Sequence, residues 1–235
     1  MKLNMKNQYS CIVPLYNERP RVIEVLSAIS QVPVISEIIC VDDGSTDGSY
    51  EEIRRRFPKI TLLRHAQNKG KAQAVKTGLQ HVFKENILLI DSDLLHLTHD
   101  DIERSIKLYE LNNLDCLLLC TMPLFAIDVF LRTTIRLPHL MTGTRIIKTN
   151  DLMAIFKTTP ICSYSLEIQE NKYLLDNNKQ VAYTNISALN VLKMRKVGVF
   201  QGVCEDFSMW RQILTQVNMK EVLRQIRYFA RRKLE

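Results

Sequence analysis

The chain has 235 residues, of which 46% are hydrophobic and 24% charged, and its formal net charge is +7. This is the composition of an ordinary globular protein with room for a substantial core. The longest charge-free apolar run, residues 116–127, is too short to span a bilayer. The apolar run near the beginning of the sequence is too short for the core of a signal peptide. We therefore expect no transmembrane segment. The net charge favours an anionic partner such as a nucleotide or a phospholipid surface. The six cysteines form no CxxC pair and no zinc-type cluster, which favours a reducing compartment, most simply the cytoplasm.

Short apolar runs alternate with helical patterns over the first half of the chain. Four runs carry aliphatic residues with little polar alternation, as parallel strands covered on both faces do. They lie at 9–15, 37–42, 59–64 and 86–91. Helical patterns begin near Glu18, within 45–57 and at 71–83. This alternation predicts right-handed βαβ units and therefore an α/β fold with an open, mostly parallel central sheet flanked by helices.

The second half is less regular. We expect a helix at 100–111, further strands at 115–121, 142–149 and 177–187, and mostly helix from Glu205 to the end. The chain has only 7 Gly, and it contains no repeat and no obvious linker. We therefore predict a single domain over residues 1–235, with a nucleotide-type first half and a second half that completes the site.

A polar or charged loop follows each of the first four apolar runs. The loops read PLYNE (14–18), DDGSTDGS (42–49), HAQNKGK (65–71) and DSD (91–93). In open α/β sheets, ligands bind beyond the carboxyl ends of the strands. Any one of these loops alone is readily explained as a solvated turn, but four at one edge of a sheet predict a ligand site.

The last of these loops holds two aspartates, Asp91 and Asp93, whose side chains can face the same way. Carboxylates without His or Cys nearby suit Mg²⁺ or Mn²⁺, which would bridge them to a ligand's diphosphate. Gly70 and Lys71 open a helix, and a helix N-terminus of this kind favours phosphate. Neither the GxGxxG nor the GxxxxGK[ST] pattern occurs, so we expect no classical dinucleotide or P-loop site.

In order and spacing, CIVPLYNE, VDDGSTDGS, NKGKAQAVKTGL and DSDLLH resemble the inverting family-2 glycosyltransferases with the GT-A fold. More narrowly, they resemble the dolichyl-phosphate mannosyltransferase and polyprenyl-phosphate glycosyltransferase branch. The likeness is strong over about 9–97 and weaker through TGTRIIKTNDL (142–152), YSLEIQE (164–170) and RKVG (195–198). It implies a division of the single domain into a nucleotide-sugar half, an acceptor half and a C-terminal helical segment. Their approximate bounds are 1–98, 99–204 and 205–235.

The resemblance also implies roles for individual residues. Asp91 and Asp93 would form the metal-binding DxD motif, with Asp93 favoured as the direct ligand, and Arg145 would face the donor sugar or the diphosphate. The nucleotide-binding set would be Pro14, Tyr16, Glu18, Asp42, Asp43, Ser45, Lys71, Ser92 and Lys196. For two of these positions a simpler interpretation stays open, since Arg145 could be a surface cation and Lys196 part of a solvated run.

The acceptor side departs from the branch pattern. His139 stands near the usual place of an aspartate, the stretch between DSD and TGTR lacks an arginine-rich loop, and Asn190 lies near the place of another arginine. Glu205 and Asp206 resemble the base segment of relatives that glycosylate hydroxyls. The alternative is that both are acidic residues at the start of the last helix, where its dipole favours them.

The tail KEVLRQIRYFARRKL (220–234) has an apolar face and a strongly basic face. Such a helix could lie on an anionic membrane surface, or it could pack on the core with its basic face in solvent. The membrane interpretation would suit a protein that is peripheral at the inner face of a membrane.

Taken together, these patterns predict a metal-dependent inverting glycosyltransferase with Mg²⁺ or Mn²⁺ as cofactor. It would move a sugar from a nucleotide-diphosphate sugar to a polyprenyl phosphate. One alternative is transfer to a saccharide hydroxyl with Asp206 as the base. Another is a catalytically silent nucleotide-binding module on the same fold. We expect no nucleic-acid partner.

Overall fold

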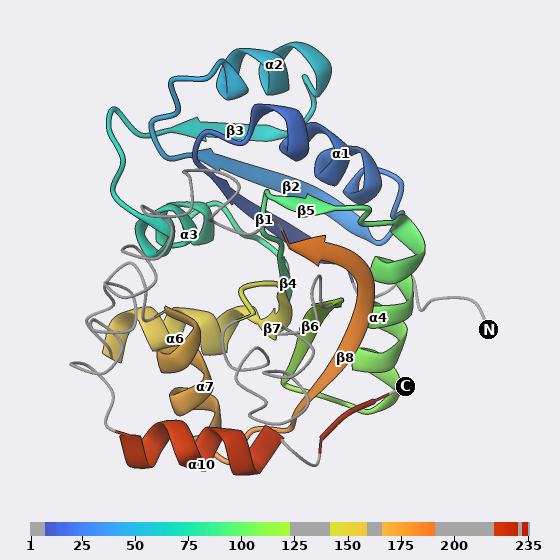
Figure 1. Ribbon diagram of the computed structural model, residues 1–235, viewed down its shortest axis with the longest axis vertical. Coiled ribbons are helices and arrows are strands. Elements are labelled where there is room, and N and C mark those ends of the chain that lie inside the picture. Colours follow the sequence, from blue (N-terminus) through green and yellow to red (C-terminus); the bar gives the residue numbers. More distant parts are fainter. Residues whose placement is uncertain (1–7, 123–141, 159–165, 191–218, 230–231, 235) are drawn as a thin grey trace.

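The computed structural model describes residues 8–122, 142–158, 166–190, 219–229 and 232–234. Their centre is a curved sheet in the strand order β3-β2-β1-β4-β7-β6-β8-β5, with helices packed around it (Figure 1). The strands are β1 (Tyr9–Leu15), β2 (Ile35–Asp42), β3 (Thr61–Arg64), β4 (Asn86–Leu89), β5 (Leu94–Leu95), β6 (Cys116–Met122), β7 (Arg145–Lys148) and β8 (Val181–Asn190). The helices are α1 (Arg19–Ile29), α2 (Ser49–Arg56), α3 (Lys71–Leu79), α4 (His99–Leu111), α6 (Thr149–Thr158), α7 (Leu166–Asp176) and α10 (Met219–Phe229).

The first four strands form the predicted parallel unit. β1 pairs in parallel with β2 on one side and with β4 on the other, and β2 pairs in parallel with β3. β7 then runs antiparallel to both β4 and β6, while β6 and β8 are parallel to each other. The predicted α/β fold with a mostly parallel central sheet is therefore confirmed, and the antiparallel β7 joins its two parallel parts.

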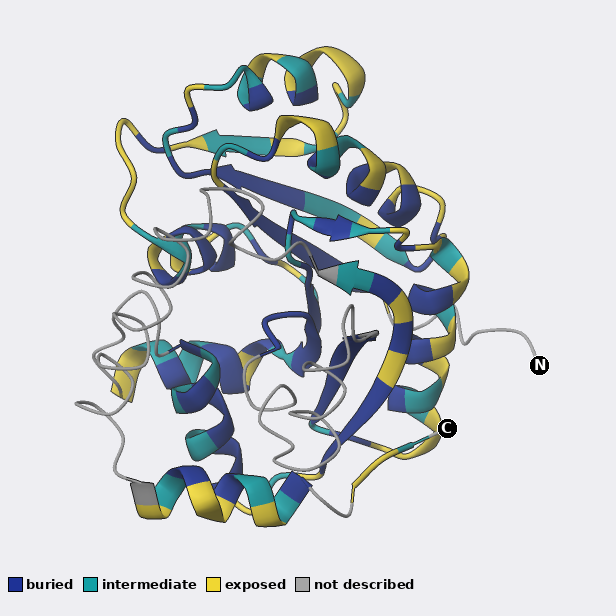
Figure 2. Ribbon diagram, viewed as in Figure 1, coloured by how far each residue is buried: buried dark blue, intermediate teal, exposed yellow. Residues whose placement is uncertain are grey.

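Two hydrophobic cores lie on opposite faces of this sheet, and the central strands β1, β4 and β7 are almost wholly buried between them (Figure 2). On one face α1 buries Val22, Val25, Leu26 and Ile29, which recur at helical spacing along the chain. The other core takes the inner faces of α3, α6, α7 and α10. Burial on both faces explains why the strands read as unbroken apolar runs rather than as alternating ones.

Some elements differ from the sequence expectation. β4 ends at Leu89, so Asp91 and Asp93 lie in the loop beyond the strand. α7 was not predicted as a helix, because its buried face includes Glu170 and Asn171 in place of apolar residues. The helical periodicity of hydrophobic residues, which is the main signal in a sequence, is therefore weak in that segment.

The C-terminal helix α10 packs on the protein. Val222 and Phe229 are buried, and the Gln225 side-chain amide donates to the Ile168 carbonyl of α7 over 3.1 Å. Beyond it, the Tyr183 carbonyl in β8 accepts a hydrogen bond from the Leu234 backbone N–H over 2.8 Å. In the structure, the apolar face of α10 therefore packs on the core, as in the second of the two interpretations of the tail. Within the described residues, no helix has the length and apolarity that a membrane crossing requires.

Candidate active site

The loops after β1 and β2 are joined to each other by hydrogen bonds. The Asn17 backbone N–H donates to the Ser45 hydroxyl over 2.9 Å, and the Asn17 side-chain oxygen accepts from the Thr46 N–H over 2.8 Å. The Arg19 N–H donates to the Asp47 carboxylate over 2.9 Å. Asn17 adopts a positive φ of 54°, a conformation that asparagine tolerates well. The two polar loops that the sequence placed at one sheet edge therefore form a single unit.

Asp42 is fully buried at the end of β2. One carboxylate oxygen accepts the Ser45 N–H over 3.0 Å, and the other lies 3.1 Å from the Arg64 Nε. The Arg64 guanidinium also donates to the Ser45 carbonyl over 2.8 Å and lies over the ring of Tyr50, 4.7 Å from its centroid. Asp42 thus shapes the loop that follows β2 and pairs with a cation from β3.

Asp43 is also buried and serves the loop that precedes α3. Its carboxylate accepts the backbone N–H groups of Lys69 and Gly70 over 2.9 and 2.7 Å. The same carboxylate lies 2.6 Å from the Nδ1 of His65, whose Nε2 is 2.9 Å from the Thr77 hydroxyl. A chain of side chains therefore fixes both the entrance and the body of α3.

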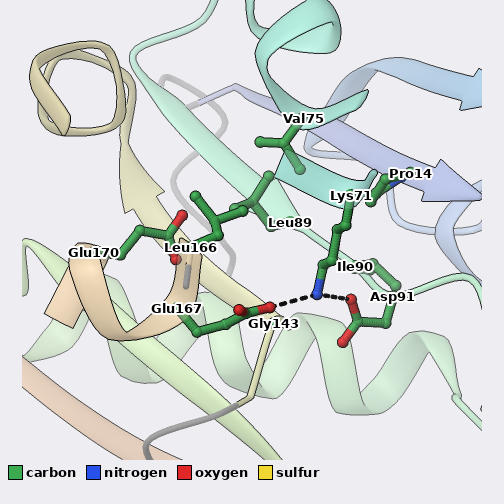
Figure 3. A pocket seen from close by; sticks show the side chains of 10 residues that line it. All are labelled: Pro14, Lys71, Val75, Leu89, Ile90, Asp91, Gly143, Leu166, Glu167 and Glu170. Atoms are coloured by element: carbon green, nitrogen blue, oxygen red, sulfur yellow. Dashed lines mark hydrogen bonds and ion pairs between the residues drawn. The ribbon is translucent and has the colours of Figure 1, made fainter. Parts of the chain in front are cut away.

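The ammonium of Lys71, the first residue of α3, lies between two carboxylates (Figure 3). Its Nζ is 2.6 Å from Asp91 Oδ1 and 2.8 Å from Glu167 Oε1. Burial by itself would lower the pKa of Lys71, but the charges of Asp91 and Glu167 outweigh this effect and raise the pKa above its ordinary value. The ammonium contributed by α3 is thus paired at the sheet edge with carboxylates from the β4 loop and α7.

Gly143 lies directly against this cluster. A β-carbon at position 143 would be 1.9 Å from the Lys71 Nζ and 2.7 and 2.8 Å from the two carboxylate oxygens of Asp91. Next to it, the Thr144 hydroxyl lies 3.4 Å from Asp91 Oδ2 and accepts the Asp91 backbone N–H over 3.3 Å. Apolar side chains complete the walls around the cluster: Pro14, Val75, Leu89, Ile90 and Leu166.

Behind this wall is a buried ion pair. Arg145 is 0% and Glu170 1% exposed, and the Arg145 Nη1 is 2.8 Å from Glu170 Oε2. The guanidinium also donates to the Thr142 carbonyl and to the Asn171 side-chain oxygen. Burial raises the pKa of the Glu170 carboxyl to about 7, although Arg145 acts in the opposite direction. Glu170 lines the pocket, whereas Arg145 lies behind it in the described part of the chain.

The remaining predicted site residues occupy different environments. Tyr16 is exposed, Glu18 is buried and lies 2.5 Å from the Arg21 Nε, and Ser92 is buried while its neighbour Asp93 is partly exposed. A hollow of about 390 Å³ lies beside the β2 and β3 loops. It is lined by Gly44, Ser45, Thr46, Arg64, His65 and Ala66. Four residues considered in the sequence lie outside the described residues: His139, Lys196, Glu205 and Asp206.

The donor chemistry at Asp91 and Asp93 fits a hard divalent cation. Both offer carboxylate oxygen, and Mg²⁺ in nucleotide sites commonly takes only one or two protein carboxylates, with phosphate and water completing its shell. The described residues contain no cluster of three or more His, Cys, Asp or Glu side chains that could hold a metal.

Several residues of this site were not assigned from the sequence. Glu167 and Glu170 stand three residues apart on α7, a spacing that puts them on one helix face, and they come from the segment YSLEIQE. Gly143 belongs to the TGTR segment, of which only the arginine was singled out. The weak family resemblance of these two segments was the one signal that could have found them.

Comparison with known proteins finds a family model and curated relatives that match parts of the chain. The family model for glycosyl transferase family 2 matches residues 10–174. A dolichyl-phosphate β-glucosyltransferase from Trichomonas vaginalis is 36% identical over 94 residues, which cover 35% of this chain and 28% of that protein. A dolichol-phosphate mannosyltransferase from Pyrococcus furiosus is 33% identical over 92 residues, which cover 37% of this chain and 26% of that protein. The chain thus spans about a quarter of the length of these two relatives.

Among solved structures, a glucosyl-3-phosphoglycerate synthase from Mycobacterium tuberculosis, in complex with Mn²⁺, uridine diphosphate and glucosyl-3-phosphoglycerate, has a TM-score of 0.67. It is 16% identical, and the match covers 94% of this chain and 80% of that one. At this identity the likeness establishes the fold, which is the predicted GT-A type.

Proposed function

The chain belongs to glycosyl transferase family 2, and on that premise we propose that it is an inverting enzyme that moves a sugar from a nucleotide-diphosphate sugar to a polyprenyl phosphate. The observation that carries the proposal is the meeting of the Lys71 ammonium and the Asp91 carboxylate beside Gly143 at the carboxyl edge of the sheet. This is the edge where open α/β sheets bind ligands. A fixed cation next to a carboxylate there suits a diphosphate and the metal that accompanies it.

In this proposal the loops after β1 and β2 receive the nucleoside. Pro14, Tyr16 and Glu18 come from the first loop, and Asp42 and Asp43 hold the second loop and the entrance of α3 in place. Ser45 joins the two loops through its hydroxyl. The aspartates would therefore influence nucleoside affinity through the loops that they organise.

The chemistry follows from where charge develops. When the bond between sugar and diphosphate breaks, negative charge builds up on the leaving group, and a cation already in place stabilises it without rearrangement. Lys71 would donate to the diphosphate oxygens. A divalent ion held by Asp91 and Asp93 would act there as a Lewis acid. The buried Arg145–Glu170 pair would fix α7, and with it Glu167, at the pocket wall.

The proposed acceptor is a lipid phosphate, which is already anionic at neutral pH and requires little help from a general base. The two relatives described above are named as a dolichyl-phosphate glucosyltransferase and a dolichol-phosphate mannosyltransferase, which supports this class of acceptor. Lys196 would contact a phosphate. In the alternative, transfer to a saccharide hydroxyl, Asp206 would serve as the base.

A peripheral contact with an anionic membrane would suit a lipid acceptor. Because the apolar face of α10 packs on the protein, this contact would use basic residues that are exposed: Lys220, Arg224, Arg227, Arg232 and Lys233. Each basic residue near such a surface contributes about 1 kcal/mol. We therefore propose an electrostatic contact without insertion of the helix.

A transfer assay tests the proposal. The protein is incubated with a panel of nucleotide sugars, with Mn²⁺ or with chelator, and with either a polyprenyl phosphate or an oligosaccharide as acceptor. We expect product with the lipid phosphate and Mn²⁺, and a drop in diphosphate affinity of about 10- to 100-fold in Asp91→Asn, since bonds to charged groups contribute roughly 1.5–3 kcal/mol each. Asp100→Asn, at an exposed aspartate of α4, is the matched control.

The same assay separates the alternatives. Product on the oligosaccharide alone, lost in Asp206→Asn, would replace the lipid phosphate by a hydroxyl acceptor. Nucleotide binding with no transfer to either acceptor would indicate the silent module. Binding and transfer that are unchanged by chelator would remove the metal from the proposal.

A further inference from the structure

We propose that the Lys71 ammonium is a built-in cation that fills the cation position at Asp91 in the metal-free protein and is exchanged for the divalent metal. Glu167 is the second anchor, which keeps the displaced ammonium in the pocket as a donor to the diphosphate. This inference rests on the proposed function, since it concerns the same site, and it assigns Glu167 as a positioning residue.

The first support is the geometry of the three charged groups. They come from three different elements, α3, the loop after β4, and α7, yet the two carboxylates converge on one nitrogen at 2.6 and 2.8 Å. Such distances are those of charge-assisted hydrogen bonds. Two anionic oxygens that face a single nitrogen enclose a space that suits one cation (Figure 3).

The second support is Gly143, which is independent of the charges. A β-carbon there would overlap the ammonium at 1.9 Å and crowd both carboxylate oxygens of Asp91. The space next to Asp91 therefore exists only because position 143 has no side chain. This space adjoins Asp91, whose carboxylate is also part of the proposed metal site.

Simultaneous occupancy is unfavourable for electrostatic reasons. A divalent ion at Asp91 and the ammonium at contact distance from the same carboxylate would repel each other strongly in a partly buried site. The ammonium has three donors on a flexible four-carbon stem, so it can leave Asp91 while it still contacts Glu167. In that position its free donors are available to the diphosphate that arrives with the metal.

Titration with Mn²⁺ alone, followed by electron paramagnetic resonance of the free ion, tests the exchange in the absence of any nucleotide. We expect Lys71→Met to bind Mn²⁺ with a dissociation constant about tenfold lower than the wild type, because a competing partly buried ion pair no longer has to be broken. Lys76→Met, at an exposed lysine of the same helix, should leave the constant unchanged. An unchanged or weakened affinity in Lys71→Met would overturn the proposal.

A second variant separates exchange from a simple change of local charge. Gly143→Ala keeps every charge, but its methyl group crowds both the ammonium and the two carboxylate oxygens of Asp91, so it should weaken Mn²⁺ binding if the metal takes the space that the ammonium leaves. If Lys71→Met tightens binding and Gly143→Ala, with a native circular dichroism spectrum, leaves it unchanged, the metal does not use that space, the ammonium acts only through its field and the exchange is refuted.

The role of Glu167 has its own measurement. With Mn²⁺ present, Glu167→Gln should weaken binding of uridine or guanosine diphosphate, and Glu167→Asp should restore part of the loss, as expected for a residue that positions a cation. Equal losses in both variants would refute that role. The Mn²⁺ titration contains no nucleotide, so tightened Mn²⁺ binding without any nucleotide binding would uphold the exchange and refute the proposed donor.

Discussion

The two halves of the site are held in place by different forces. In the first half, Asn17, Asp43 and Asp47 accept or exchange hydrogen bonds with backbone N–H groups of neighbouring loops. In the second half, Arg145 and Glu170 depend mainly on each other, in surroundings that exclude water. Hydrogen bonds to the main chain are modest and numerous, whereas a buried charge without its partner is very costly. A single substitution should therefore cost little stability in the first half of the site and much more in the second half.

The sharpest test of this contrast is Arg145→Met. Removing one member of a buried ion pair leaves an uncompensated carboxyl at Glu170, and we expect the free energy of unfolding to fall by about 3–5 kcal/mol. Urea unfolding followed by circular dichroism measures it. The control is Arg224→Met, whose exposed pair with Asp176 should contribute less than about 1 kcal/mol.

A double variant identifies the cause of the loss. Arg145→Met combined with Glu170→Met replaces both charges by apolar groups, and we expect it to recover much of the stability lost in the single variant. If the double variant is as unstable as the sum of the two single ones, packing around the guanidinium dominates and the contrast in its present form is wrong.

The second prediction concerns pH and the same pair. The pKa of Glu170 is raised from an ordinary 4.5 to about 7, chiefly by burial. Between these values the folded protein retains a proton that the unfolded chain releases, so this group's stabilising contribution is complete below pH 4.5 and is lost as the pH rises through 7. The free energy of unfolding should fall by about 3 kcal/mol over this interval, at roughly 1.4 kcal/mol per pKa unit.

Urea unfolding between pH 4.5 and 8 measures how the free energy of unfolding changes with pH. The difference between the wild type and Glu170→Gln should change across that interval, because glutamine does not titrate. Glu24→Gln, at an exposed position of α1, should follow the wild type throughout. A pH-independent difference between the wild type and Glu170→Gln would mean that the carboxylate is charged across the whole interval.

The contrast between the halves also explains what the sequence could predict. The parallel unit β1 to β4 is visible as apolar runs, and its polar loops follow those runs directly, so local patterns suffice to place Asp42, Asp43, Lys71 and Asp91 at one edge. These features depend on chain neighbours and on the rule that parallel strands end together.

The second half could be predicted only in part, because its site depends on distant pairings. Glu167 contacts Lys71 across 96 positions of the sequence. Arg145 was expected to face the donor, yet it lies at the start of an antiparallel strand with its charge directed to Glu170. No local pattern records which of several arginines and glutamates will meet inside a core, since that is decided when β7 and α7 pack together.

The smallest expected effect, and the test of the first half, is Asp43→Ala. It removes the side-chain acceptor of the Lys69 N–H and one of the two acceptors of the Gly70 N–H, whose other acceptor is the Asn68 side-chain oxygen. This should lower the free energy of unfolding by about 1–3 kcal/mol, less than in Arg145→Met. Because these groups fix the entrance of α3, which begins at Lys71, diphosphate affinity should fall as well. Asp43→Asn keeps one acceptor oxygen and should restore part of both losses, measured by urea unfolding and calorimetry with Mn²⁺ and uridine or guanosine diphosphate. A stability loss as large as that of Arg145→Met would show that the two halves do not differ in their sensitivity to substitution. Unchanged diphosphate affinity would show that the entrance of α3 does not affect diphosphate binding.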